Sequence, residues 1–136
     1  MLTRLATCIL AATTFVSVSD AYARARLEPI RNYDIPVATG SGKVIPAETL
    51  REVIIAAGQR GRRQWAFSNG GEDKLIGILA VRAHRLEVEV EYSPERVWVR
   101  YKSSEHLKED NGNIHRNYNK WVGELVNAMR VRLTRF

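Results

Sequence analysis

The sequence predicts an α+β domain in which two helices cover one face of a four-stranded antiparallel sheet. Four consecutive segments rich in apolar residues, three of them alternating or β-branched, are separated by short polar turns. A segment with helical spacing of apolar residues precedes this run, and another follows it. Short connections join antiparallel neighbours, and a sheet with one apolar face must be covered. The predicted order is therefore helix, four-stranded antiparallel meander and C-terminal helix, with both helices packed on one face.

The first helix is predicted over residues 46–59. Pro46 suits the first helical position because it has no amide hydrogen to leave unpaired, and Glu48 lies in the first turn, where the helix dipole favours an acid. Gly58 or Gly61 ends the helix. The residues that recur at spacings of three and four are Ala47, Leu50, Val53, Ile54 and Ala57.

The four strands are predicted over residues 63–68, 74–82, 85–92 and 96–103, with turns at 69–71, 83–84 and 94–95. The last hairpin fixes the two faces of the sheet, because a slip of one residue would exchange them. On one face, acidic residues lie opposite aromatic or basic ones: Glu91 with Trp98, Glu89 with Arg100 and Glu87 with Lys102. The other face carries apolar side chains: Leu86, Val88, Val90, Val97, Val99 and Tyr101.

The register of the preceding strand follows from a tight turn at residues 83–84. It adds three apolar residues to the core face: Leu75, Leu79 and Val81. It also leaves Ile76, Ile78 and Ala80 as an apolar strip on the outer face, beside the glutamates. Such a strip is either a contact surface for a partner or an ordinary exposed patch of a monomer, and the sequence leaves both open.

A long amphipathic helix is predicted from Asn113, as its N-cap, to the end of the sequence. At roughly 100° per residue, one stripe contains Tyr118, Val122, Leu125, Met129, Leu133 and Phe136. Ile114, His115 and Trp121 lie at the margins of this stripe. The helix is therefore expected to cover the sheet with its apolar stripe and to leave its basic residues in water.

Residues 1–23 have the pattern of a cleavable signal peptide. A short cationic start precedes an apolar run, and Ala21-Tyr22-Ala23 has the small-x-small pattern of a cleavage site. The apolar run has about fourteen residues, fewer than the roughly 20 that span a bilayer, so a transmembrane span is not expected after cleavage. Residues 24–43 mix proline, glycine and polar residues without a period and predict an extended N-terminal arm, either disordered or lying on the domain. Residues 44–136 form the predicted single domain.

The cysteine content and the net charge limit the kinds of site and partner that the protein can have. Cys8 lies inside the predicted signal peptide, so the mature chain has no disulfide, thiolate metal site or cysteine nucleophile. The formal charge is +6, and removal of residues 1–23 takes away Arg4 and Asp20 and leaves that charge unchanged. In the periplasm the abundant anions are lipid phosphates and lipopolysaccharide, and no nucleic-acid partner is expected. The charge either serves solubility or attracts an anionic envelope component.

The strongest candidate site is a polar cluster where the last strand meets the final helix. Its members are Ser103, Ser104, His115, Asn117, Asn119 and Lys120, with Trp98 as a further candidate for stacking on a ligand. His115 suits proton transfer or ligand binding, or it fixes the start of the helix by local hydrogen bonds. Arg60, Arg62 and Arg63 suit either a phosphate or the C-terminal dipole of the first helix.

No motif in the sequence requires a reaction. There is no nucleophile elbow, and the three histidines do not have a metal-binding spacing, so neither catalytic residues nor a metal or other cofactor is predicted. The sequence does not predict an oligomeric state.

Several strings of the chain carry a family resemblance: Trp65, ILAVRAH (78–84), VEVEYS (88–93), VRYKSS (99–104) and, most specifically, IHRNYNKWV (114–122). Over roughly residues 40–130 the chain resembles a family of small proteobacterial envelope proteins that are described as lipoproteins of unknown function. The resemblance implies a periplasm-facing α+β domain without an assigned activity. The chain lacks a cysteine at the end of its apolar segment, so a free periplasmic form is expected.

Three hypotheses for the function follow. The first is a non-catalytic module that binds another envelope component through the outer sheet face or through a pocket near His115. The second is a small hydrolase or ligand-binding protein that uses His115, Asn119 and Ser103. The third is a peripheral protein that binds anionic lipid surfaces through its arginines.

Overall fold

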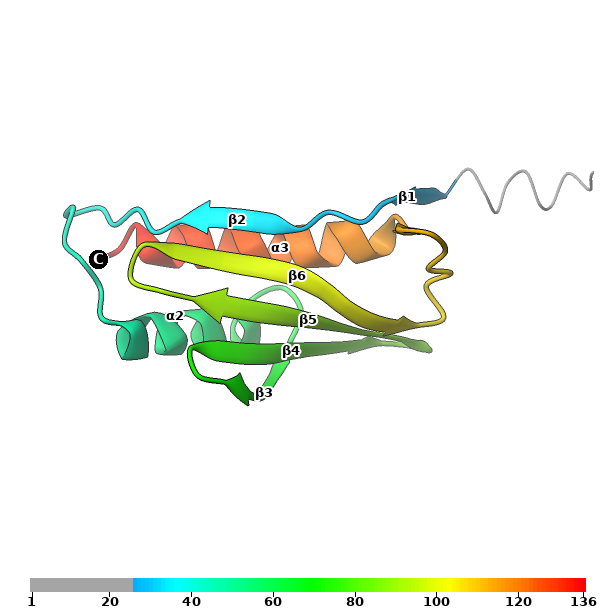
Figure 1. Cartoon of the computed structure of the whole chain (residues 1–136), viewed down its shortest axis with the longest axis horizontal. Helices are drawn as coiled ribbons and strands as arrows, with labels where there is room; N and C mark the ends of the chain where they lie inside the picture. The colour runs from blue at the N-terminus through cyan, green and yellow to red at the C-terminus, as the bar shows by residue number, and fades with distance from the viewer. Residues whose placement is uncertain (1–25) are drawn as a thin grey trace, which may run out of the picture.

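A computed structural model describes residues 26–136 of the chain, so the predicted signal peptide lies outside the described residues. The chain is an α+β fold, as predicted. Its elements, in chain order, are β1 (Leu27–Pro29), β2 (Tyr33–Pro36), α2 (Ala47–Gln59), β3 (Ala66–Gly71), β4 (Lys74–Val81), β5 (His84–Tyr92), β6 (Arg96–Glu105), β7 (Asn113–His115) and α3 (Asn117–Leu133) (Figure 1).

The main sheet has five antiparallel strands in the order β2-β6-β5-β4-β3. Four of them are the predicted meander, and the fifth is β2, which runs along the free edge of β6 (Figure 1). The sequence did not reveal this strand because four residues that end in Pro36 are too short to show an alternating pattern. Within the predicted extended arm, Ile35 of β2 is only 1% exposed, so the arm lies on the domain and contributes to its core.

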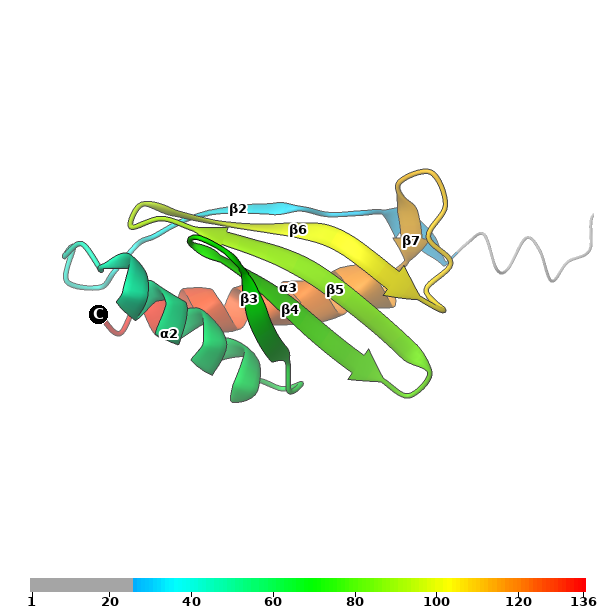
Figure 2. The same cartoon turned by 60° about the horizontal axis from the view of Figure 1, so that its bottom comes forward.

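Both helices pack on one face of the sheet. Their buried residues join the core-facing residues of β4, β5 and β6 in one hydrophobic cluster. Figure 2 shows α2 crossing the end of the sheet near β3, with α3 along its length. The predicted core stripe of α3 is buried from Tyr118 to Leu133. Phe136, which was expected in the same stripe, is 45% exposed, because it lies beyond the end of the helix at Leu133.

The β5–β6 hairpin has the predicted register from the turn as far as Val88. Tyr92 lies opposite Val97, and Glu89 lies opposite Arg100. Beyond this point β6 has one extra residue, so Glu87 lies opposite Ser103 rather than Lys102, which corrects the predicted pair. Lys102 still places its Nζ atom 3.6 Å from a carboxylate oxygen of Glu87, so the charge complementarity survives the bulge.

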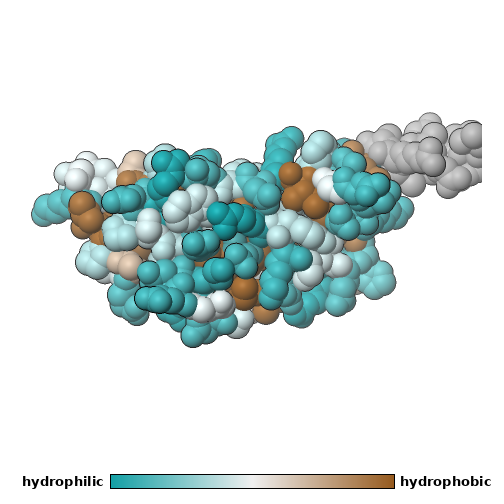
Figure 3. Space-filling view, in the orientation of Figure 1, coloured by the Kyte–Doolittle hydropathy of each residue, from teal (hydrophilic) through white to brown (hydrophobic). Residues whose placement is uncertain are grey.

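The outer face of the sheet carries a charged ladder, and its apolar strip is narrower than predicted. Lys74 Nζ lies 3.2 Å from Glu89 Oε1, and Arg100 Nη1 lies 3.0 Å from Glu91 Oε2. Ile76 is only 9% exposed, Ile78 is half-buried, and of the three only Ala80 is exposed. In the orientation of Figure 1 the surface is largely hydrophilic, with hydrophobic residues in small separate groups (Figure 3). This face therefore lacks a continuous apolar patch.

Four boundaries differ from the predictions. The first strand of the meander, expected over residues 63–68, is β3 at Ala66–Gly71. Asn113 is not the N-cap of the last helix: residues 113–115 form β7, whose backbone pairs with β1, and α3 begins at Asn117. The β3–β4 turn lies after Gly71, which is still paired with Lys74 across a bulge, and not at residues 69–71. The β4–β5 turn lies at residues 82–83, because His84 pairs with Val81. Within residues 26–136, the structure contains no helix with the length and hydrophobicity to cross a membrane.

Candidate functional site

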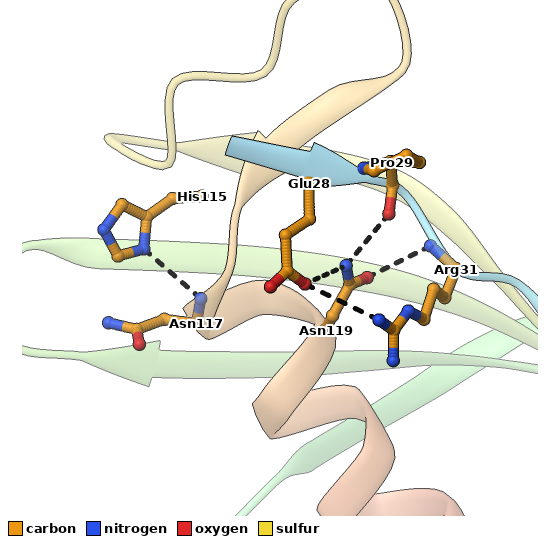
Figure 4. Close-up of polar contacts among 6 residues, drawn as sticks. All are labelled: Glu28, Pro29, Arg31, His115, Asn117 and Asn119. Atoms are coloured by element: carbon orange, nitrogen blue, oxygen red, sulfur yellow. Dashed lines mark hydrogen bonds and ion pairs between the residues drawn. The ribbon is translucent and has the colours of Figure 1, made fainter. Parts of the chain in front are cut away.

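Asn119, in the first turn of α3, joins this helix to the N-terminal arm. Its side chain is 5% exposed, and its Oδ1 accepts a hydrogen bond of 3.0 Å from the backbone amide of Arg31. Its Nδ2 donates to the carbonyl of Pro29 at 2.9 Å and to Oε2 of Glu28 at 3.2 Å (Figure 4). A buried amide with partners for both of its ends stabilises the contact between the arm and the helix.

His115 lies where β7 passes into α3. Its Nδ1 accepts a hydrogen bond of 3.2 Å from the backbone amide of Asn117, at the start of the helix (Figure 4). Burial lowers the pKa of His115 below its ordinary value of 6.5, and the neighbouring basic groups lower it further, in the order Arg26, His84, Arg116 and Lys108. The imidazole is therefore neutral at pH 7 and lies in a positive environment.

The first pocket at this end of α3, the arm-side pocket, has a volume of about 400 Å³. It is lined by three cations, two amides and one carboxylate: Arg31, Arg116, Lys120, Asn117, Asn119 and Glu28. The carboxylate compensates little of this charge, because Nη2 of Arg31 is 3.8 Å from Oε2 of Glu28 and the arginine side chain is 65% exposed. No ion pair within residues 26–136 involves Arg116 or Lys120.

The second pocket, the sheet-side pocket, has a volume of about 280 Å³. Its lining contains no carboxylate within the described chain: Arg63, Val81, Arg82, His84, Asn117, Lys120 and Trp121. The Arg63 guanidinium lies 5.2 Å from the centre of the Trp121 ring, and its Nε is 3.3 Å from Oε2 of Glu124, outside hydrogen-bond alignment. Trp121 and Glu124 therefore hold Arg63 in place beside the pocket.

The predicted site residues separate into two groups. Asn117, Asn119 and Lys120 line the arm-side pocket. His115 does not line it but accepts a hydrogen bond from the backbone amide of Asn117. Ser103, Ser104 and Trp98 line neither pocket. Ser103 is exposed on β6, and Ser104 Oγ lies 3.0 Å from the hydroxyl of Tyr101.

Trp98 lies on the outer face of the sheet, away from the polar cluster. It is paired with Asp34 on β2 and with Glu91 on β5, and the guanidinium of Arg100 is 6.0 Å from its ring centre. Its nearest charged neighbours thus belong to the ladder of the outer face.

Sequence reasoning missed most of the cations that line these pockets. It missed Arg31 in the arm, Arg82 in the β4–β5 turn and Arg116 before α3, whereas Arg63, which follows α2, was already a candidate for binding a phosphate. Their spacing in the sequence carries no signal, because four separate segments bring them together. Arg116 alone could have been included, since it lies inside the IHRNYNKWV string.

No protein family model, curated protein or solved structure matches this chain. The family resemblance of the sequence therefore stays a prediction, and the function must be argued from the pockets. No group of three or more His, Cys, Asp or Glu side chains within residues 26–136 is arranged to hold a metal ion.

Proposed function

We propose that this protein is a non-catalytic binding module of the periplasm that holds an anionic group of another envelope component in the arm-side pocket. The observation that carries the proposal is the imbalance of charge in this pocket, where Arg31, Arg116 and Lys120 face one carboxylate. Arginine and lysine side chains bind phosphate and carboxylate groups by charge-assisted hydrogen bonds, and arginine does so with two parallel donors. A phosphate-type group is thus the ligand chemistry that fits the pocket.

The start of α3 supports the same ligand chemistry. The helix has 17 residues, its N-cap residue Arg116 makes no side-chain capping hydrogen bond, and its first turn has no acidic residue. The positive end of its dipole is therefore not compensated by a side chain of its own first turn, and an anion in the adjacent pocket would complement it.

The contacts of His115 favour a binding module over a hydrolase. A general base needs a free acceptor nitrogen beside a nucleophile. Nδ1 of His115 accepts a hydrogen bond from the backbone amide of Asn117, so the neutral imidazole carries its hydrogen on Nε2 and neither nitrogen is a free acceptor. Asn119 is likewise occupied by the arm, and Ser103 does not line the pocket. The periplasmic location rests on the predicted signal peptide of residues 1–23.

The proposal is tested by titrating the purified protein with inorganic phosphate at low ionic strength, followed by calorimetry. Arg116→Gln removes one charge and its donors from the pocket, and a charged hydrogen bond contributes about 1.5–3 kcal/mol, so an affinity at least about tenfold lower is expected. The matched control is Arg130→Gln, which removes an exposed charge from α3 outside both pockets and should leave the affinity nearly unchanged.

Two results would contradict the proposal. The first is the absence of phosphate binding at low ionic strength, where screening is weakest. The second is an equal loss of affinity in the Arg116 and Arg130 variants, because it would show a general effect of net charge and no specific site.

A further inference from the structure

The two pockets at the start of α3 are neighbours with a shared wall. Asn117 and Lys120, which belong to the first turn of α3, line both pockets. Arg31 and Arg116 belong to the arm side, and Arg82 belongs to the sheet side. The basic surface therefore continues from the N-terminal arm, across the first turn of α3, to the β4–β5 turn.

The sheet-side pocket has its own uncompensated charge. Arg63 is paired with Glu124, but Arg82 has no ion pair with any carboxylate of residues 26–136. Arg82 is exposed and sits in the two-residue turn with a φ of 55°. The turn places the backbone of Arg82 beside the pocket. Its guanidinium group has no carboxylate partner among the described residues and is available to an anionic ligand.

We infer that the two pockets form one bipartite site for a ligand with two phosphate-type groups, one in each pocket, with Lys120 between them. This inference rests on the proposed function and specifies its ligand class. Like charges that the fold gathers around one helical turn repel one another, and a ligand with two anionic groups relieves the repulsion on both sides of Lys120. A ligand with a single group leaves one side unrelieved.

The volumes agree with this assignment. Each pocket, of about 400 and about 280 Å³, is many times larger than the roughly 30 Å³ that one water occupies in the liquid. Each therefore has room for a phosphate group with accompanying water. The lowered pKa of His115, to which His84 on the sheet side and Arg116 on the arm side both contribute, agrees with a positive field that covers both pockets.

The experiment compares two soluble sugar phosphates that differ in one group, fructose 6-phosphate and fructose 1,6-bisphosphate, by calorimetry at low ionic strength. The bisphosphate should bind at least about tenfold more tightly, because the second group adds charge-assisted hydrogen bonds in the second pocket. Arg82→Gln should weaken the bisphosphate about fivefold or more and leave the monophosphate nearly unchanged. Arg116→Gln should weaken both ligands, and Arg130→Gln should weaken neither.

The outcomes separate this inference from the proposed function. Equal affinities for the two sugar phosphates, or an Arg82 variant that binds the bisphosphate normally, would overturn the bipartite site while the arm-side pocket stands. Failure of both ligands to bind, or binding that is insensitive to Arg116→Gln, would overturn the proposed function as well. Thermal unfolding of each variant verifies that the fold is intact.

A vesicle assay distinguishes a soluble ligand from a lipid headgroup with the same chemistry. The protein is sedimented with phosphatidylglycerol vesicles in the presence and absence of the bisphosphate. Displacement of the protein by the bisphosphate supports the bipartite site as the point of contact. Binding to vesicles without binding to either soluble probe would overturn the bipartite site, because it would show attraction of dispersed charges to a surface.

Discussion

At the scale of single residues, His115 couples the start of α3 to the charges around it. Its Nδ1 accepts a backbone hydrogen bond, and burial together with four neighbouring basic groups lowers its pKa below 6.5. In the unfolded chain the imidazole has its ordinary pKa, so the unfolded state takes up the proton first as the pH falls. The proton-linked contribution of His115 to the free energy of unfolding is therefore absent above about pH 7.5, and it becomes destabilising as the pH drops through 6.5 toward the folded-state pKa.

This prediction is tested with His115→Gln. As the pH is lowered from 8 to 5, the unfolding free energy of the wild-type protein should fall more than that of the variant. An NMR titration of the imidazole should give a pKa below 6.5 in the free protein, and bound phosphate should raise it. A normally titrating imidazole, with a difference in stability that does not depend on pH, would contradict the assignment.

At the scale of elements, replacing a helical glycine by alanine should change the stability in opposite directions at Gly58 and at Gly123. A Cβ atom at Gly58 of α2 would overlap the ring of Phe67 on β3 and would lie 3.0 Å from Cβ of Trp65. A Cβ atom at Gly123 of α3 would meet nothing nearer than the hydroxyl of Tyr33, at 3.4 Å. Alanine has a helix propensity about 1 kcal/mol better than glycine at both positions, so packing decides the sign at Gly58.

We expect Gly123→Ala to raise the unfolding free energy by up to about 1 kcal/mol and Gly58→Ala to lower it by about 1–3 kcal/mol. Chemical denaturation measures both changes. Combining Gly58→Ala with Phe67→Leu should recover part of the loss, because the smaller side chain leaves room for the new methyl group. Stabilisation by Gly58→Ala would show that α2 does not pack closely on β3.

At the scale of the whole molecule, Asn119 joins segments that are far apart in the sequence. It bonds to Pro29 and Arg31 of the arm, 90 and 88 residues away, and the same arm supplies β1 and the edge strand β2. Asn119→Ala leaves a backbone donor and a backbone acceptor without their partner, and such a loss costs about 1–3 kcal/mol. We therefore expect lower stability and, by hydrogen exchange, faster exchange of the Arg31 amide.

Asn127→Ala is the matched control, because Asn127 is an exposed asparagine on the same helix. Its effect should stay within about 0.5 kcal/mol. Equal stability of the two variants, with an unchanged Arg31 amide, would show that the strand pairings of β1 and β2 hold the arm without help from Asn119.

Local sequence patterns brought together only those predicted site residues that belong to one helical turn. The IHRNYNKWV string contains Asn117, Asn119 and Lys120, and these three residues line one pocket because residues in one helical turn stay close in any fold. Trp98 and Ser103 line neither pocket: Trp98 lies opposite Glu91 on the outer face of the sheet, as the hairpin register predicts, and Ser103 lies beyond the bulge in β6, opposite Glu87.

The fold class, the α2 helix, the four-stranded meander and the register of the hairpin next to its turn were predictable from the amino-acid sequence, because they depend on periodicity and on contacts between neighbouring segments. The fifth strand, the start of α3 and the gathering of Arg31, Arg82 and Arg116 around Lys120 became visible in the folded chain. These features depend on pairing between segments far apart in the chain, and such pairing leaves no period in the sequence.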